Sequence, residues 1–194
     1  MDYYLIIICI ILIIWNIRLY TEFPETLVVS RIDGGTYSVK KNHHNKQEAS
    51  DILARLNAIN NQLISHLKRK YQGTNKIGDI SYLYNNYNGD VLQEHTPRGP
   101  VNTSYVLNKG DVVKLCLRDP ITNDFHDFNT LLFVNFHELS HLLDRKWGHS
   151  DSFWSGFRFI LIEAVRLNMY TPVDYRKTPA SYCGISITSS PLFP

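Results

Sequence analysis

Residues 127–144 read DFNTLLFVNFHELSHLLD and carry the most informative pattern in this chain of 194 residues. Apolar side chains recur there at helical spacing, at Leu131, Val134, Leu139 and Leu142. Asp127 or Asn129 can cap the helix that this spacing predicts. Because the stretch is apolar on most sides, we expect the helix to be buried against the rest of the fold.

The predicted helix contains the sequence His137-Glu138-Leu139-Ser140-His141. Histidines four residues apart lie about 40° apart around a helix and about 6 Å apart along it, so both can bind one tetrahedral zinc ion. Glu138, beside the first histidine, can act as general base toward a water molecule at the metal. The alternative is a helix with solvent-facing histidines, but its apolar flanks argue against that, because buried polar side chains need partners.

A catalytic zinc site needs a third protein ligand and one open coordination position. His149 follows His141 by eight residues, in a polar turn that lets the chain fold back, and we predict it as the third ligand. Glu163, on a second helix predicted over residues 153–168, is the reserve candidate. His126, just before the first helix, is another.

The rest of the chain predicts a domain that mixes helices and strands. Residues 45–70 predict a helix that starts with a capping box at Asn45 and ends in three basic residues. Residues 105–118 predict an antiparallel hairpin with its turn at residues 108–111. A short strand is expected over residues 80–84, within a stretch rich in Gly, Asn and Tyr.

The first 20 residues differ in character from the remainder. Residues 3–17 read YYLIIICIILIIWNI and carry no charge. Fifteen helical residues span about 22 Å, less than a hydrocarbon core of about 30 Å, but Arg18 and flanking aromatic residues can extend the span to Tyr20. We therefore predict a transmembrane helix over residues 1–20. A cleaved signal peptide is disfavoured, because Asp2 lies in its n-region and no typical cleavage site follows.

Positive residues follow this segment and none precedes it, so the positive-inside rule predicts a single-pass membrane protein with its catalytic domain in the cytosol. Residues 21–44 form a connector in which residues 27–29 and 37–39 can be short strands. The domain that carries the histidines then occupies residues 45–194.

Composition narrows the possible partners and ligands. Hydrophobic residues make up 44% of the chain, and 20 basic against 18 acidic side chains give a net charge of +2. This balance is too even to indicate a nucleic-acid partner. Cys9, Cys116 and Cys183 are too few and too scattered for a disulfide framework. We expect them to be unpaired, as in a reducing compartment, so histidine and carboxylate must supply most metal ligands.

The sequence HELSHLLDRKWGHSDSFW at residues 137–154 resembles the zinc site of the WLM and SprT-like metallopeptidases, in which a HExxH helix is followed by a short turn, Gly-His and an aromatic residue. The resemblance implies a minimal zincin-like α+β domain, with a small antiparallel sheet beside the active-site helix and flanking helices. It also implies one Zn²⁺ per chain, held by His137, His141 and His149, with Glu138 as the catalytic base.

Residues 173–191 resemble proteins encoded by large DNA viruses. The function implied is a membrane-anchored zinc metallopeptidase that acts on a protein or peptide substrate, with no nucleic-acid partner expected, since no DNA-binding extension is found. Tyr175, Arg176 and Tyr182 are possible oxyanion donors. Two alternatives stay open: a non-catalytic, zinc-stabilised binding module at a membrane, and a hydrolase that acts on a non-peptide amide.

Overall fold

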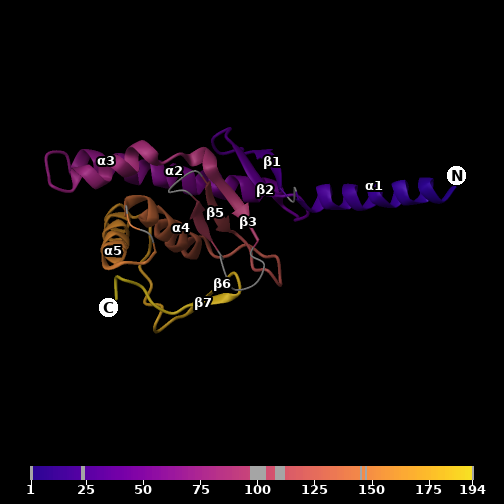
Figure 1. Cartoon of the computed structure of the whole chain (residues 1–194). Helices are drawn as coiled ribbons and strands as arrows, with labels where there is room; N and C mark the ends of the chain where they lie inside the picture. Colours follow the sequence, from indigo (N-terminus) through magenta and orange to yellow (C-terminus); the bar gives the residue numbers. More distant parts are fainter. Residues whose placement is uncertain are drawn as a thin grey trace.

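The computed structural model describes residues 2–22, 25–96, 104–107, 112–144, 146 and 148–193. The predicted turn at residues 108–111 and Trp147 of the zinc-site pattern lie outside the described residues. In chain order the elements (Figure 1) are α1 (Asp2–Glu22), β1 (Glu25–Val29), β2 (Thr36–Lys40), α2 (Lys46–Lys70), α3 (Ile77–Asn86), the 3₁₀ turn η1 (Gly89–Val91), β3 (Leu92–His95), β4 (Tyr105–Leu107), β5 (Val112–Cys116), α4 (Phe128–Leu143), α5 (Asp151–Arg166), β6 (Ala180–Tyr182) and β7 (Ile185–Ile187).

Five strands form one mixed sheet in the order β1-β2-β3-β5-β4. The predicted hairpin is confirmed, because β4 and β5 pair antiparallel with Tyr105 opposite Lys114. The short strands expected in the N-terminal connector are present as β1 and β2, which complete the other edge. Contrary to the small antiparallel sheet that was expected, β3 lies parallel to both β2 and β5. Parallel neighbours need a crossover connection, which α2 and α3 provide between β2 and β3.

The helix predicted over residues 45–70 is confirmed as α2, which packs against β1, β2 and β3. The capping box is wrong, since Asn45 adopts a left-handed conformation (φ 54°) and its side chain makes no capping hydrogen bond. The strand predicted over residues 80–84 is also wrong, because these residues lie in α3. Ile80 and Leu83 are three residues apart, and only a helix turns both into the core.

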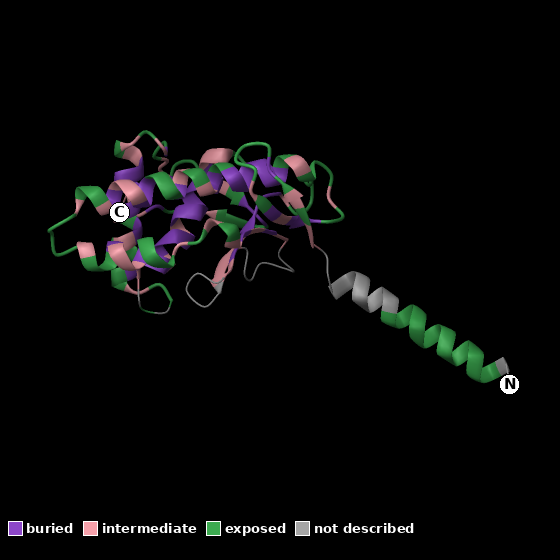
Figure 2. Cartoon of the chain, turned by 90° about the horizontal axis from the view of Figure 1, so that it is seen from above, coloured by how far each residue is buried: buried purple, intermediate pink, exposed green. Residues whose placement is uncertain are grey.

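The helix predicted over residues 127–144 is confirmed as α4, and the carboxylate of Asp127 caps it by accepting the backbone N–H of Thr130 at 3.0 Å. Helix α5 packs along α4, where the ring centroids of Phe133 and Phe157 lie 5.1 Å apart. Figure 2 shows buried residues along the inner faces of the helices. Burying each such phenylalanine stabilises the fold by about 1.5–3 kcal/mol. The helix that carries the HExxH sequence is therefore held by the core.

Helix α1 extends away from the body of the molecule in both views (Figures 1 and 2), and its side chains at residues 3–15 are exposed. The prediction of a transmembrane helix over residues 1–20 is wrong. The prediction of a single-pass membrane protein with a cytosolic catalytic domain depends on that helix and is wrong as well. Across the part of the chain that the structure describes, no helix has both the length and the apolar character needed to cross a bilayer. The uncharged run stops at residue 17, and its fifteen residues reach only about 22 Å against the roughly 30 Å required.

The C-terminal hairpin of β6 and β7 forms a separate two-stranded sheet. Its turn consists of Cys183 and Gly184, both with positive φ (50° and 82°). Cys183 forms a disulfide with Cys116 at the end of β5. The expectation of unpaired cysteines is therefore wrong for these two, because the fold joins residues 67 positions apart, a pairing that spacing along the chain does not reveal. Cys9 is free and exposed.

Candidate metal centre

Three histidines meet where α4 faces the start of α5. His137 and His141 lie one turn apart on α4, with ring centroids 5.0 Å apart. His149, in the connection to α5, reaches back so that its Nε2 is 3.0 Å from Nε2 of His137. The three side chains, which we call the histidine cluster, offer ligand atoms that all lie within 4.8 Å of one another.

The connection between α4 and α5 fixes His149 from both sides. Gly148 has φ 78°, a conformation that glycine adopts without steric cost. On the other side, the hydroxyl of Ser150 accepts the backbone N–H of Phe153 at 3.3 Å and so caps α5. The same hydroxyl donates to Oδ2 of Asp144 at 2.9 Å. His149 is thus held between two ordered helix ends.

Aromatic rings restrict the imidazoles. The ring of Phe153 stacks on His141 at 4.3 Å between centroids. The ring of Trp154 lies 5.8 Å from that of His149. Phe153 and Trp154 are the aromatic residues that follow Gly148-His149 in the zinc-site pattern, and their rings limit rotation of the histidines they touch.

The environment keeps the α4 histidines neutral. Burial, together with repulsion from His141 and His149, lowers the pKa of His137 to about 3. Burial and His149 lower the pKa of His141 to about 4, although Asp144 opposes the change. Neutral imidazoles present free lone pairs, so this donor set fits Zn²⁺. Among the described residues, no fourth His, Cys, Asp or Glu ligand atom joins the group, which matches a site with an open coordination position.

Glu138 follows His137 on α4, and only 4% of the residue is exposed. Burial raises the pKa of Glu138 to about 8. A carboxylate with an increased affinity for protons is suited to general-base catalysis near neutral pH. Glu138 therefore lies next to His137, at the position where the sequence predicts a general base.

A cleft of about 410 Å³ adjoins the histidine cluster. Helix α4 contributes His137 and Glu138 to its lining, and the C-terminal segment contributes Tyr182 and residues 185–189. Ser104, just before β4, also lines it, and its Oγ lies 2.6 Å from the hydroxyl oxygen of Tyr182. Helices α4 and α5, the C-terminal hairpin and Ser104 before β4 therefore line one cavity.

The reserve ligand Glu163 lies outside the histidine cluster. It is fully buried and accepts a hydrogen bond from the ammonium group of Lys70 at 2.6 Å, with Arg166 as a second cationic partner. Burial opposes ionisation, but these cations lower the pKa of Glu163. A carboxylate that is already paired with two cations has a structural role, so the geometry favours His149 over Glu163.

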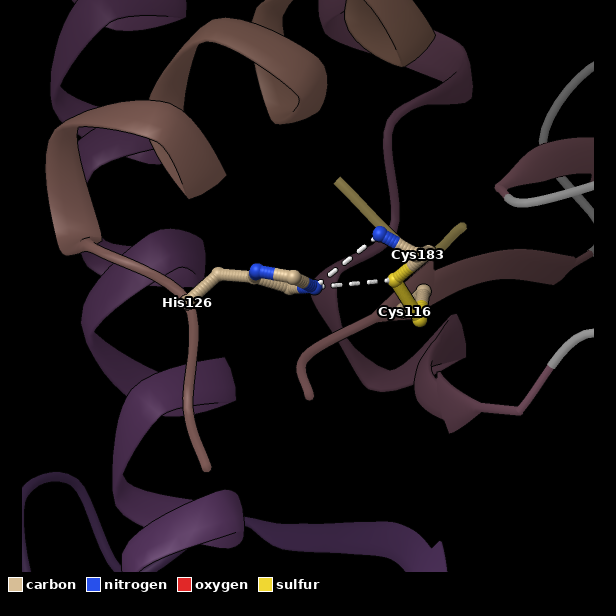
Figure 3. Close-up of side chains that lie close together, drawn as sticks. All are labelled: Cys116, His126 and Cys183. Carbon is tan, nitrogen blue, oxygen red and sulfur yellow. Dashed lines mark hydrogen bonds between the residues drawn. A yellow bond between two sulfur atoms is a disulfide. The ribbon is translucent and has the colours of Figure 1, made fainter. Parts of the chain in front are cut away.

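The other reserve ligand, His126, belongs to a second group with Cys116 and Cys183, which we call the cysteine–histidine cluster (Figure 3). Nε2 of His126 lies 3.2 Å from Sγ of Cys183 and accepts the backbone N–H of that residue at 3.2 Å. Spacing along the chain does not indicate this group, because Cys183 is 57 positions from His126.

Of the three possible oxyanion donors, Tyr182 lines the cleft. Tyr175 is buried with its ring 4.8 Å from that of Phe133, and the guanidinium of Arg176 pairs with Asp174 at 3.2 Å. No catalytic or metal-binding motif in the sequence includes Ser104 or residues 185–189, so only the tertiary structure places them at the cleft.

Comparison with known proteins identifies viral relatives, as the resemblance of residues 173–191 predicted. The chain is 31% identical over 186 residues to "Uncharacterized protein R325" of Acanthamoeba polyphaga mimivirus, covering 94% of this chain and 92% of that protein. It is 42% identical over 69 residues to protein 042R of invertebrate iridescent virus 3 and 30% identical over 109 residues to protein 136R of invertebrate iridescent virus 6. These matches cover 36% and 54% of this chain, and 43% and 55% of the iridescent virus proteins.

No protein-family model matches the chain. Among solved structures, the chain is similar to the crystal structure of Wss1 from Saccharomyces cerevisiae, with a TM-score of 0.49 and 17% identity over 67% of this chain and 87% of that one. The relationship to the mimivirus protein spans nearly the full length of both sequences. This chain belongs to the same family as R325 of Acanthamoeba polyphaga mimivirus.

Proposed function

We propose that this chain is a zinc-dependent peptidase in which His137, His141 and His149 hold one Zn²⁺ and Glu138 is the general base. The observation that carries the proposal is the convergence of three imidazole groups within 4.8 Å, beside a buried carboxylate and at the edge of a cleft. The lowered pKa values of His137 and His141 support it, because both side chains are ready to bind a cation at neutral pH.

Bound zinc would supply a Lewis acid that polarises the substrate carbonyl and acidifies a water molecule. Glu138 accepts the proton of the attacking water and transfers it to the leaving amine. Tyr182, whose hydroxyl is held by Ser104, is the candidate donor to the negative charge that develops on the carbonyl oxygen. The chain's own residues thus account for ligation, proton transfer and charge stabilisation.

The cleft also indicates a substrate class. Three aromatic side chains line the cleft: Phe133, Trp154 and Phe157. The hydroxyl-bearing residues Ser186, Thr188 and Ser189 also line it. Such a surface suits a peptide that places an apolar side chain against the rings while its backbone meets polar groups. We therefore propose protein or peptide substrates.

The test is zinc content and peptide hydrolysis of the purified full chain. We expect one zinc per chain by elemental analysis and cleavage of an unfolded protein such as casein. Cleavage should stop after removal of zinc with 1,10-phenanthroline and return when zinc is added. Zinc binding without hydrolysis of any peptide would instead indicate a zinc-stabilised binding module, and hydrolysis that survives removal of the metal would contradict the proposal.

A further inference from the structure

The C-terminal hairpin is attached to the domain by a covalent bond at its turn. Cys183 in this turn is bonded to Cys116 at the end of β5 (Figure 3), and each residue is only 1% exposed. In the described part of the chain, β6 and β7 pair with each other and with no other strand. A two-stranded hairpin is at best marginally stable by itself, so its position depends on what fastens it to the body.

The backbone of Cys183 is unusual for a cysteine. The described residues include four non-glycine residues with positive φ, of which three are asparagines and the fourth is Cys183. Asparagine tolerates this conformation, whereas most other side chains do not. Asn-Gly would be the favoured sequence for a two-residue hairpin turn, yet the chain has Cys183-Gly184. The bond made by the sulfur accounts for a cysteine at a position that local geometry does not favour.

Neighbouring groups fix the same turn. Nε2 of His126 accepts the backbone N–H of Cys183 at 3.2 Å, and its ring lies 5.0 Å from that of Tyr182. On the other side, the hydroxyl of Ser104 accepts the backbone N–H of Cys116 at 3.0 Å and lies 2.6 Å from the hydroxyl oxygen of Tyr182. The disulfide is thus the centre of a group that sets the position of Tyr182.

The fastened hairpin lines the cleft of the histidine cluster. Tyr182 and residues 185–189 line the cavity to which His137 and Glu138 belong. Tyr182 immediately precedes the bonded Cys183, so the disulfide is the covalent attachment of the residues that form this wall.

We propose that the Cys116–Cys183 disulfide is a redox-controlled clamp that holds the C-terminal hairpin as one wall of the cleft. A dithiol reductant would break the S–S bond by transferring two electrons and two protons, which leaves thiols on Cys116 and Cys183 and oxidises the dithiol to a disulfide. The reduced hairpin then separates from β5 and the cleft loses its wall. The effect on catalysis rests on the proposed peptidase function, whereas the release of the hairpin does not.

The test compares the full chain with the double variant Cys116→Ala/Cys183→Asn and with Cys9→Ser as the matched control. The double variant removes the bond but creates an Asn-Gly turn, which favours the hairpin itself. Any loosening must therefore come from loss of the attachment. We expect amide hydrogen exchange at residues 180–189 to accelerate more than about tenfold in this variant and in wild type treated with dithiothreitol. Cys9→Ser should behave like untreated wild type. Peptidase kcat/KM of the double variant should fall at unchanged zinc content.

Three outcomes would overturn the clamp. The first is unchanged exchange at residues 180–189 in both the reduced protein and the double variant. The second is faster exchange with an unchanged peptidase rate, which would show that the hairpin does not control the cleft. The third is one additional zinc per chain in reduced wild type but not in the double variant, which would make the cysteine–histidine cluster a metal site instead. If wild type hydrolyses no peptide, the proposed function fails and the exchange measurement still decides whether the clamp exists.

Discussion

The histidine cluster and the cysteine–histidine cluster are alike in one respect: each brings three metal-competent side chains within 4.8 Å of one another. They differ in everything around those atoms. His149 is exposed and the histidine cluster adjoins a cleft, whereas Cys116 and Cys183 are buried and their sulfurs are bonded to each other. Glu138 lies beside the histidine cluster. In the cysteine–histidine cluster, the backbone N–H of Cys183 donates a hydrogen bond to Nε2 of His126.

The comparison shows that proximity of ligand atoms does not by itself decide function. An imidazole whose lone pair accepts a hydrogen bond, beside two sulfurs that share a covalent bond, has no free donor set to offer a cation. Neutral imidazoles at the edge of a cleft do. We therefore propose that similar side chains bind a catalytic metal at one site and fasten a hairpin at the other, and the following experiments separate the two roles.

The largest effect is expected from Glu138→Gln. The amide cannot accept the proton of the attacking water, so kcat should fall by about 10²–10⁴-fold, while zinc content stays near that of wild type because Glu138 is not a ligand. Peptide hydrolysis and elemental analysis measure both. Glu163→Gln is the matched control, since it neutralises a buried carboxylate that is bound to Lys70 and lies outside the cluster. Glu163→Gln should lower the free energy of unfolding and leave kcat close to that of wild type. Full activity of Glu138→Gln would falsify the mechanism.

The next largest effect concerns the covalent bond. Cys116→Ala/Cys183→Ala opens a loop between residues separated by 67 positions, and the chain-entropy relation predicts a loss of about 4 kcal/mol in the free energy of unfolding. Urea denaturation measures it, and Cys9→Ser should unfold like wild type. Zinc bound by the histidine cluster should remain. Loss of zinc in the double variant would mean that the two clusters are not independent.

A third experiment compares one histidine from each cluster. His149→Ala removes a proposed ligand, and zinc affinity should fall by more than the roughly 10–100-fold typical of losing a supporting residue outside the ligand set. His126→Ala should leave zinc affinity unchanged, because its Nε2 already accepts the backbone N–H of Cys183. Competition with a chromogenic chelator gives both values. A larger loss for His126→Ala than for His149→Ala would reverse the assignment.

How much of this was predictable from sequence depends on the range of the interactions. Helix α4, its cap at Asp127 and the facing pair His137 and His141 follow from spacing within one helix. His149 follows from the short connection to α5. Each of these features is set by residues a few positions apart, so local periodicity and capping preferences contain the information.

The errors concern interactions between distant residues or the balance between similar local states. The parallel pairing of β3, the disulfide between β5 and the terminal turn, and the wall formed by residues 185–189 depend on tertiary packing. The run at residues 80–84 is apolar at positions compatible with a strand, but a helix buries Ile80 and Leu83 better. In the N-terminal segment, the predicted span depends on Arg18 and flanking aromatic residues to extend an uncharged run of about 22 Å. Among the residues that the structure describes, no helix is both long enough and apolar enough to span a membrane.

The smallest effect is expected from the pH dependence of His126. Burial lowers the pKa of His126 below its usual 6.5, although the charge of Asp119 opposes this. The unfolded chain therefore binds a proton more readily than the folded one. The stability that the neutral imidazole contributes is complete above about pH 6.5 and is lost as the pH falls below that value.

Protonated Nε2 can no longer accept the backbone N–H of Cys183, so the terminal turn loses one attachment while the disulfide stays intact. Urea midpoints of the zinc-loaded protein between pH 7.5 and 5 should fall less steeply for His126→Gln, whose side-chain oxygen accepts the same N–H without titrating. Equal slopes for wild type and His126→Gln would show that the histidine of this cluster does not support the hairpin through its neutral form.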